Sequence, residues 1–173
     1  MAVVEGAVPS VSLLGTQTVV AASFKDSYSA PLTRGGVGPV DLFHSLFGHR
    51  PGWMKALLIA RNTVAGWCGL EVPTVADIRN VEIRDHYAVG DKIGPWPIFA
   101  LTETELIAGR DNPHLNFRLS VLTRTVDGVP HVFVSTICLV NHWSGRLYLF
   151  FIVPFHRWGV RQLVENAVAA GRL

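Results

Sequence analysis

Residues 115–140 of the chain read LNFRLSVLTRTVDGVPHVFVSTICLV, and this stretch predicts a β-hairpin. Two runs rich in β-branched and aromatic residues flank Asp127-Gly128, a dipeptide that favours a tight two-residue turn. In the second run, from His131 to Val140, the alternate positions are largely apolar on both faces. We therefore expect this strand to be covered on both sides for much of its length.

Short β-rich runs also precede the hairpin, and turn residues at Val89-Gly90-Asp91 and from Gly109 to Pro113 separate them. This alternation predicts an antiparallel meander from Asp77 to Val140. Near the N-terminus, Thr18 to Pro31 is rich in β-branched and aromatic residues without a helical stripe, and it predicts a first strand.

Three segments have helical spacing. A short helix is predicted after Asp41 and ends at Gly48, and a second is predicted over Trp53 to Trp67. The third, Arg146 to Ala170, is long, with Ser144 as its expected cap. Pro154 lies inside it and predicts a kink, because proline lacks the backbone donor.

Leu147 to Val153 is apolar all round, so the sequence predicts that this part of the long helix is buried on every side. The sheet would supply one covering. The other could be the first two helices, a ligand, a second subunit in a homodimer, or a membrane surface.

Composition places the chain among globular proteins. Of its 173 residues 49% are hydrophobic and 16% are charged, and the excess of apolar residues suits a lined internal cavity. We expect a flexible lead-in over residues 1–17 and a single domain over residues 18–173.

Several classes of function find no support in the sequence. The net charge is only +2 and no basic run is present, so nucleic acid is not an expected partner. Cys68 and Cys138 are far apart and lack nearby metal-ligand spacing, which predicts no metal, no disulfide and reduced thiols in a cytoplasmic protein. We also expect no cofactor. Leu147 to Phe155, the longest apolar run, is about half of the ~20 residues that a transmembrane helix needs.

The order of strand, two helices, antiparallel meander and long C-terminal helix defines an α+β chain. It resembles the helix-grip fold of the Bet v 1 and START-like (SRPBCC) proteins. More specifically, the chain after about Phe24 resembles a bacterial family known as domain of unknown function 2867. Three blocks carry this resemblance: Gly109-Arg110-Asp111-Asn112-Pro113-His114-Leu115-Asn116-Phe117-Arg118, Ser144-Gly145-Arg146-Leu147-Tyr148-Leu149 and Pro154-Phe155-His156-Arg157.

The resemblance implies a cavity between a curved sheet and the C-terminal helix. Across the wider superfamily such cavities bind lipids, polyketides and steroids, and some members catalyse cyclisation, isomerisation or dehydration without a cofactor. Relatives of the domain also occur fused to Rossmann-type reductases, although this chain has no GxGxxG motif. The resemblance thus favours a hydrophobic ligand-binding domain or a natural-product enzyme. An interaction module that dimerises or docks on a reductase is the alternative.

The tightest polar group in the sequence is Asp111, His114 and Arg118, which could orient an acidic ligand or move a proton. The same residues could instead form a structural turn. His142 and His156 flank the start of the long helix and are further candidates, catalytic or merely hydrogen-bonded. Glu103 and Glu105 share a strand face, for which solvent exposure is the simpler expectation.

Large aromatic residues are the expected lining of a cavity, with plain core packing as the alternative for each. Thr136, Cys138 and Tyr148 could add sparse polar groups. The full set of predicted ligand-binding residues is Trp53, Trp67, Trp96, Phe99, Phe117, Thr136, Cys138, Tyr148, Phe151 and Phe155.

Overall fold

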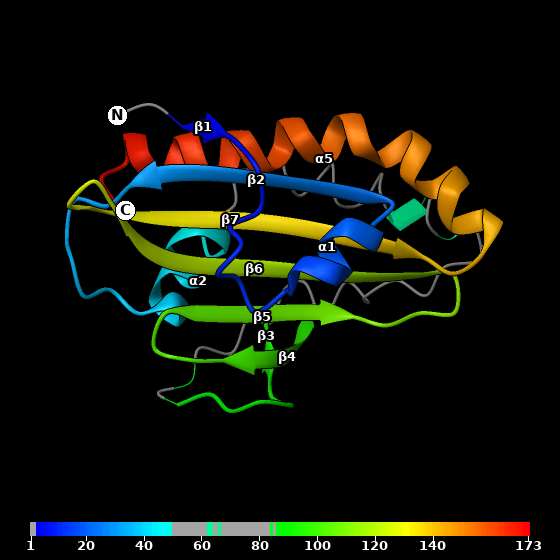
Figure 1. Cartoon of the computed structure of the whole chain (residues 1–173), viewed down its shortest axis with the longest axis horizontal. Coiled ribbons are helices and arrows are strands. Elements are labelled where there is room, and N and C mark those ends of the chain that lie inside the picture. Colours follow the sequence, from blue (N-terminus) through cyan, green and yellow to red (C-terminus); the bar gives the residue numbers. More distant parts are fainter. Residues whose placement is uncertain (1–2, 50–61, 64–65, 67–83, 85) are drawn as a thin grey trace.

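The computed structural model describes residues 3–49, 62–63, 66, 84 and 86–173. A curved antiparallel sheet of seven strands forms its centre, in the order β1-β2-β7-β6-β5-β4-β3 (Figure 1). The strands are β1 (Val4–Glu5), β2 (Phe24–Pro31), β3 (Lys92–Ile93), β4 (Trp96–Leu101), β5 (Glu105–Arg110), β6 (Leu115–Val126) and β7 (Val129–Val140). The predicted antiparallel meander is confirmed over the described residues from Lys92 onward.

The predicted hairpin is β6 and β7. Val126 pairs with Val129, so the turn consists of Asp127 and Gly128, with φ angles of 49° and 80°. Positive φ at both positions is what a two-residue hairpin turn of this kind requires. Residues 134–138 of β7 are buried without interruption, so both faces of the strand are covered as expected.

Two predicted helices are confirmed as α2 (Pro39–Phe47) and α5 (Trp143–Ala169), and α5 continues through Pro154. The predicted helix from Trp53 to Trp67 lies mostly outside the described residues. Among the described residues, no helix is both long and apolar enough to cross a membrane.

The helix α5 begins earlier than the sequence suggested. Its N-cap is His142 rather than Ser144, because the His142 side chain accepts a hydrogen bond from the Ser144 backbone N–H. A cap side chain in this position satisfies one of the free N–H groups of the first turn.

The predicted first strand is correct only in its second half. Thr16–Ala21 forms a short helix, α1, and β2 begins at Phe24, where it pairs with Cys138 of β7. Val19 and Ala22 pack on the cluster of Leu14, Ile107 and Ile137, on the face of the sheet opposite α2. Packing against the sheet therefore outweighs the β propensity of Thr18 to Ala22.

The sheet is covered on both faces, with α2 and α5 on one and residues 8–22 on the other (Figure 1). We call these the helix face and the N-terminal face. Residues 1–17 were expected to be a flexible lead-in. The described part of this segment forms β1 beside β2 and then crosses the N-terminal face, where Ser12 and Leu13 contact Glu105.

The start of α5 is joined to the turn between β5 and β6. The backbone carbonyl of His114 accepts hydrogen bonds from the N–H groups of Asn141 (3.0 Å) and His142 (3.3 Å). The side chain of Asn141 donates to the Asn112 carbonyl at 3.1 Å. These contacts fix the point at which α5 leaves β7 and so determine how it crosses the sheet.

Gly145 tests this junction. Because an added Cβ there would collide with the His114 carbonyl oxygen, we expect Gly145→Ala to lower the free energy of unfolding by about 1 to 3 kcal/mol in denaturant titration. Gly35→Ala is the matched control, since nothing lies within 4 Å of its Cβ. Equal stability of the two variants would contradict the close approach.

Candidate functional site

Three polar side chains come together on the helix face, and we call them the Asp26 cluster. Asp26 on β2 and Thr136 on β7 are paired across the two strands, and His156 reaches them from α5. The His156 Nε2 atom lies 3.4 Å from Asp26 Oδ2. The Asp26 side chain is 0% exposed and that of His156 is 26% exposed.

Within the part of the chain that the structure describes, four polar atoms of this cluster have no hydrogen-bond partner. Both carboxyl oxygens of Asp26, Thr136 Oγ1 and His156 Nε2 are buried without a partner, since the geometry of the 3.4 Å contact is not that of a hydrogen bond. A buried polar group without a partner costs about 1 to 3 kcal/mol, and a charged one costs more. The cluster is therefore a set of acceptors and donors that a ligand or an ordered water could satisfy.

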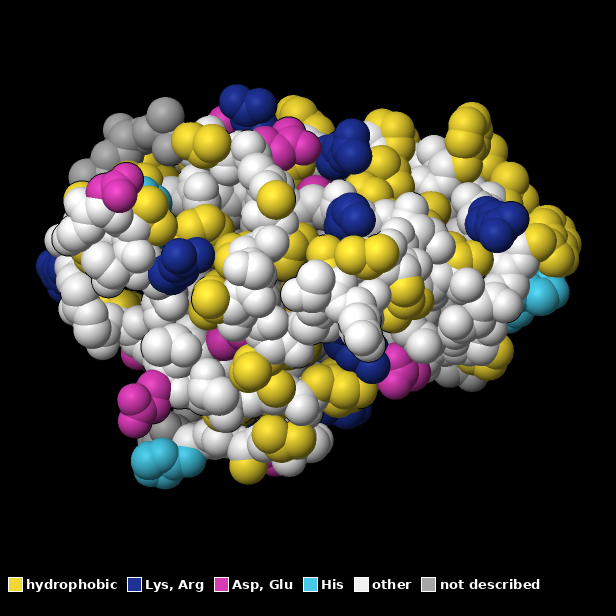
Figure 2. Space-filling view, viewed as in Figure 1, with side chains coloured by type: hydrophobic (Ala, Val, Ile, Leu, Met, Phe, Trp, Pro, Cys, Tyr) yellow, Lys and Arg dark blue, Asp and Glu magenta, His cyan; other side chains and the backbone are white. Residues whose placement is uncertain are grey.

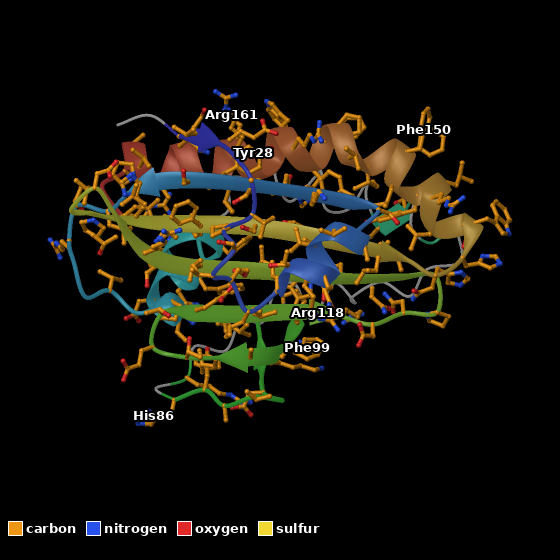
Figure 3. The ribbon with its side chains drawn as sticks, viewed as in Figure 1. Tyr28, His86, Phe99, Arg118, Phe150 and Arg161 are labelled. Atoms are coloured by element: carbon orange, nitrogen blue, oxygen red, sulfur yellow. The ribbon has the colours of Figure 1, made fainter. Side chains whose placement is uncertain are left out.

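Aromatic side chains surround the cluster. Phe24 meets the His156 ring edge-to-face at 5.4 Å between centroids, and the guanidinium of Arg157 lies 5.6 Å from the Phe24 centroid. Tyr28, two residues beyond Asp26 on the same face, is buried, and burial raises its pKa to about 12 with a smaller contribution from the Asp26 carboxylate. Tyr28, labelled in Figure 3, therefore keeps its proton at neutral pH.

Sequence reasoning missed Asp26. The signal is present in the β2 sequence FKDSYSAP, because Phe24, Tyr28 and Ala30 are the apolar phase of the strand and Asp26 stands within that phase. A charged residue at an inward position of a strand is a departure that favours a functional interpretation.

A second buried carboxylate, Glu105, differs from Asp26 because it is fully hydrogen-bonded to its neighbours. It is 1% exposed on the N-terminal face and accepts hydrogen bonds from Ser12 Oγ (2.5 Å), Leu13 N (2.7 Å) and Ser120 Oγ (2.5 Å). The expectation of solvent exposure is wrong for Glu105, because residues 12–14 cover it. Its donors mark it as a structural anchor for the N-terminal segment.

The four predicted catalytic residues separate into two groups, and neither reaches the Asp26 cluster. Arg118 forms a bidentate ion pair with Asp111, at 2.7 and 3.1 Å, and its guanidinium stacks 3.6 Å from the Phe99 centroid (Figure 3). Arg118 pairs with Ile137, which packs on the N-terminal face. The ion pair therefore stabilises the turn before β6 on the side of the sheet away from α5.

His114 and His142 meet at the start of α5. Ser144 Oγ lies 2.8 Å from His114 Nδ1 and 3.1 Å from His142 Nδ1, and the two imidazole rings are 5.4 Å apart. A serine between two imidazoles could in principle be activated as a nucleophile. The three side chains also hold the first turn of α5 in place, and this structural role is enough to explain their contacts.

The predicted ligand-binding residues are also divided. Trp96, Phe117, Thr136, Cys138 and Tyr148 belong to the helix-face layer and are wholly or partly buried there. Phe99 stacks on Arg118 instead, and Phe151 and Phe155 are about half-exposed on α5. Trp53 and Trp67 lie outside the described residues.

A hollow that the sequence did not suggest lies near the end of α5. It has a volume of about 400 Å³ and is lined by Val3, Thr33, Glu165, Val168 and Ala169, near the C-terminal end of α5. It contains none of the predicted ligand-binding residues. Within the described ranges, no group of three or more His, Cys, Asp or Glu side chains could hold a metal ion.

The curved sheet and the long C-terminal helix define an α+β protein with a helix-grip fold. The family described as "Protein of unknown function (DUF2867)" matches residues 19–163, and the chain belongs to this family. No curated protein and no solved structure matches the chain.

The two buried carboxylates give a stability test of the site. Asp26→Leu removes a buried carboxyl group for which the described residues supply no hydrogen bond, so we expect the free energy of unfolding to stay within about 1 kcal/mol of the wild type or to rise. Glu105→Met removes the acceptor of three donors, so we expect a loss of about 3 kcal/mol or more. Denaturant titration of both variants measures this difference, and a large loss in Asp26→Leu would identify Asp26 as structural.

The environment of Tyr28 predicts a pH dependence. Between pH 10 and 12 the unfolded chain releases the Tyr28 proton while the folded chain retains it, so stability falls as the pH rises through this range. Tyr28→Phe removes this contribution, and its unfolding free energy should fall less steeply than that of the wild type between pH 10 and 11. If chemical denaturation shows that the unfolding free energies of Tyr28→Phe and the wild type fall equally with pH, the pKa of Tyr28 is not raised by folding.

Proposed function

We propose that the chain binds a small apolar molecule between the helix face of the sheet and α5, with the Asp26 cluster receiving the ligand's polar group. The observation that carries this proposal is the unpartnered, buried carboxyl group of Asp26 beside Thr136 and His156. Its oxygens are hydrogen-bond acceptors, so the complementary ligand carries a hydroxyl or amine donor on an apolar body.

The surroundings suit such a ligand. Phe24, Cys138, Tyr148 and Leu149 form an apolar cluster on the helix face, next to the three polar side chains. A few polar groups within a largely apolar lining are the usual composition of small-molecule sites. Because the Asp26 side chain is fully enclosed, ligand entry requires side chains of α5 to move aside.

The ligand class follows from the fold by analogy. A lipid-, polyketide- or steroid-like compound with one hydroxyl group has the required combination of apolar body and donor, and the Bet v 1 and START-like superfamily binds such compounds. His156 and Asp26 could also move a proton on such a ligand, as a cofactor-independent cyclase, isomerase or dehydratase would require. Binding is the primary proposal, and catalysis would build on it.

Two measurements on the full chain test binding. Native mass spectrometry of the protein as purified should show a non-covalent adduct that is lost on denaturation. Titration with N-phenyl-1-naphthylamine, a neutral apolar probe with one N–H donor, should show saturable fluorescence enhancement.

Variants locate the probe. Cys138→Trp fills the helix-face layer and should abolish probe binding, while Thr136→Val, which keeps the shape and removes only the hydroxyl group, should weaken it by up to about tenfold. Val20→Trp adds the same indole to an exposed position of α1 and should leave binding unchanged. Unaltered binding in both Cys138→Trp and Thr136→Val would exclude this site.

A further inference from the structure

The helix α5 carries a row of apolar side chains that are half-exposed or more. Trp143 and Phe150 are 68% and 75% exposed, and the other members are roughly half-exposed. We call this row the aromatic ridge; it consists of Trp143, Leu147, Phe150, Phe151, Phe155 and Trp158. The prediction that Leu147 to Val153 is buried on every side is therefore wrong, because the sheet and core cover only one side of the helix.

The ridge is one continuous surface. Its members recur at intervals of three and four residues, which places them on the same side of a helix, and the row from 143 to 158 is ~24 Å long. Tyr148, Leu149 and Leu163 occupy the opposite side and are buried against the sheet and core. Figure 2 shows hydrophobic side chains gathered along this edge of the molecule, and Figure 3 shows Phe150 pointing away from it.

Positive charge accompanies the ridge. Arg146, Arg157 and Arg161 are exposed on α5, and the helix has no acidic residue before Glu165. Arg161 is paired with Glu165 at 2.9 Å, whereas Arg146 and Arg157 lie within the span of the ridge itself. A surface that is both apolar and basic is complementary to one that is apolar and anionic.

We propose that the aromatic ridge docks on the surface of a membrane that contains anionic lipids, with α5 lying parallel to the bilayer plane. Tryptophans at both ends of the row, Trp143 and Trp158, suit this position because indole rings favour the headgroup region. The aromatic side chains insert at the boundary of the acyl chains while Arg146 and Arg157 contact lipid phosphates. A second copy of the chain is disfavoured as the occupant, since it would bring the same arginines to the interface.

Vesicle co-sedimentation of the full chain tests this inference, which does not depend on the ligand proposed above. The protein should sediment with vesicles of phosphatidylcholine and phosphatidylglycerol at a ratio of about 3:1, and much less with phosphatidylcholine alone. Raising the salt concentration to about 0.5 M should weaken binding, because the headgroup charges are then screened.

Single substitutions identify the surface. Phe150→Asp should lower the partition coefficient at least ~10-fold, and Arg146→Gln should lower it about fivefold. Val20→Asp is the matched control: Val20 is 72% exposed but lies on α1, on the N-terminal face, and its substitution should have no effect. Circular dichroism checks that each variant is folded.

Three results would overturn the inference. The first is failure of the wild-type protein to bind the anionic vesicles. The second is equal binding by Phe150→Asp and Val20→Asp. The third is a dimer, seen by sedimentation equilibrium, that Phe150→Asp dissociates, since the ridge would then be covered by a second copy.

Discussion

The pairing of β7 with β2 on one side and β6 on the other aligns residues from distant parts of the sequence. In one transverse row it places Asp26, Thr136 and Leu119 side by side on the helix face. In the neighbouring row it places Ser27, Ser135 and Ser120 on the N-terminal face. A shift of one residue in the β2–β7 register would move Asp26 to the other face, so the candidate site exists only in this register.

The two buried carboxylates show how the same fold uses charge in two ways. Glu105 has three hydrogen-bond donors and holds the N-terminal segment on the sheet. Asp26 has a histidine at 3.4 Å and no hydrogen bond from any described residue, although its side chain is equally enclosed. Because an unsatisfied buried polar group destabilises a protein, the presence of Asp26 in β2 is better explained by a bound partner than by stability.

The sequence predicted those parts of the fold that local patterns determine. Asp127-Gly128 between two β-rich runs was sufficient for the hairpin, and helical spacing was sufficient for α2 and α5. The sequence could not predict that Thr18 to Ala21 would be helical, because this segment packs on a cluster whose members Leu14, Ile107 and Ile137 come from distant parts of the chain. Arg118 and Phe117 are adjacent in the sequence but face opposite sides of the sheet, so proximity in the chain was a poor guide to the site.

The burial of α5 illustrates a similar limit. A helix that is apolar on all sides need not be buried on all sides, because the sequence does not show which side the protein's own core covers. Tyr148 and Leu149 are buried on the helix face, whereas the next two residues of α5, Phe150 and Phe151, point to the other side of the helix and are exposed. The two proposed partners would account for both sides of α5: the ligand would contact the side that faces the sheet, and the lipid surface would contact the aromatic ridge.

A crystal structure of the protein as purified tests the central claim most directly. The account predicts electron density for an organic molecule on the helix face, with a donor atom about 2.7 to 3.2 Å from an Asp26 carboxyl oxygen. Density for side chains alone around Asp26, or for an ordered water that satisfies Asp26 and Thr136 in a fully packed layer, would contradict it.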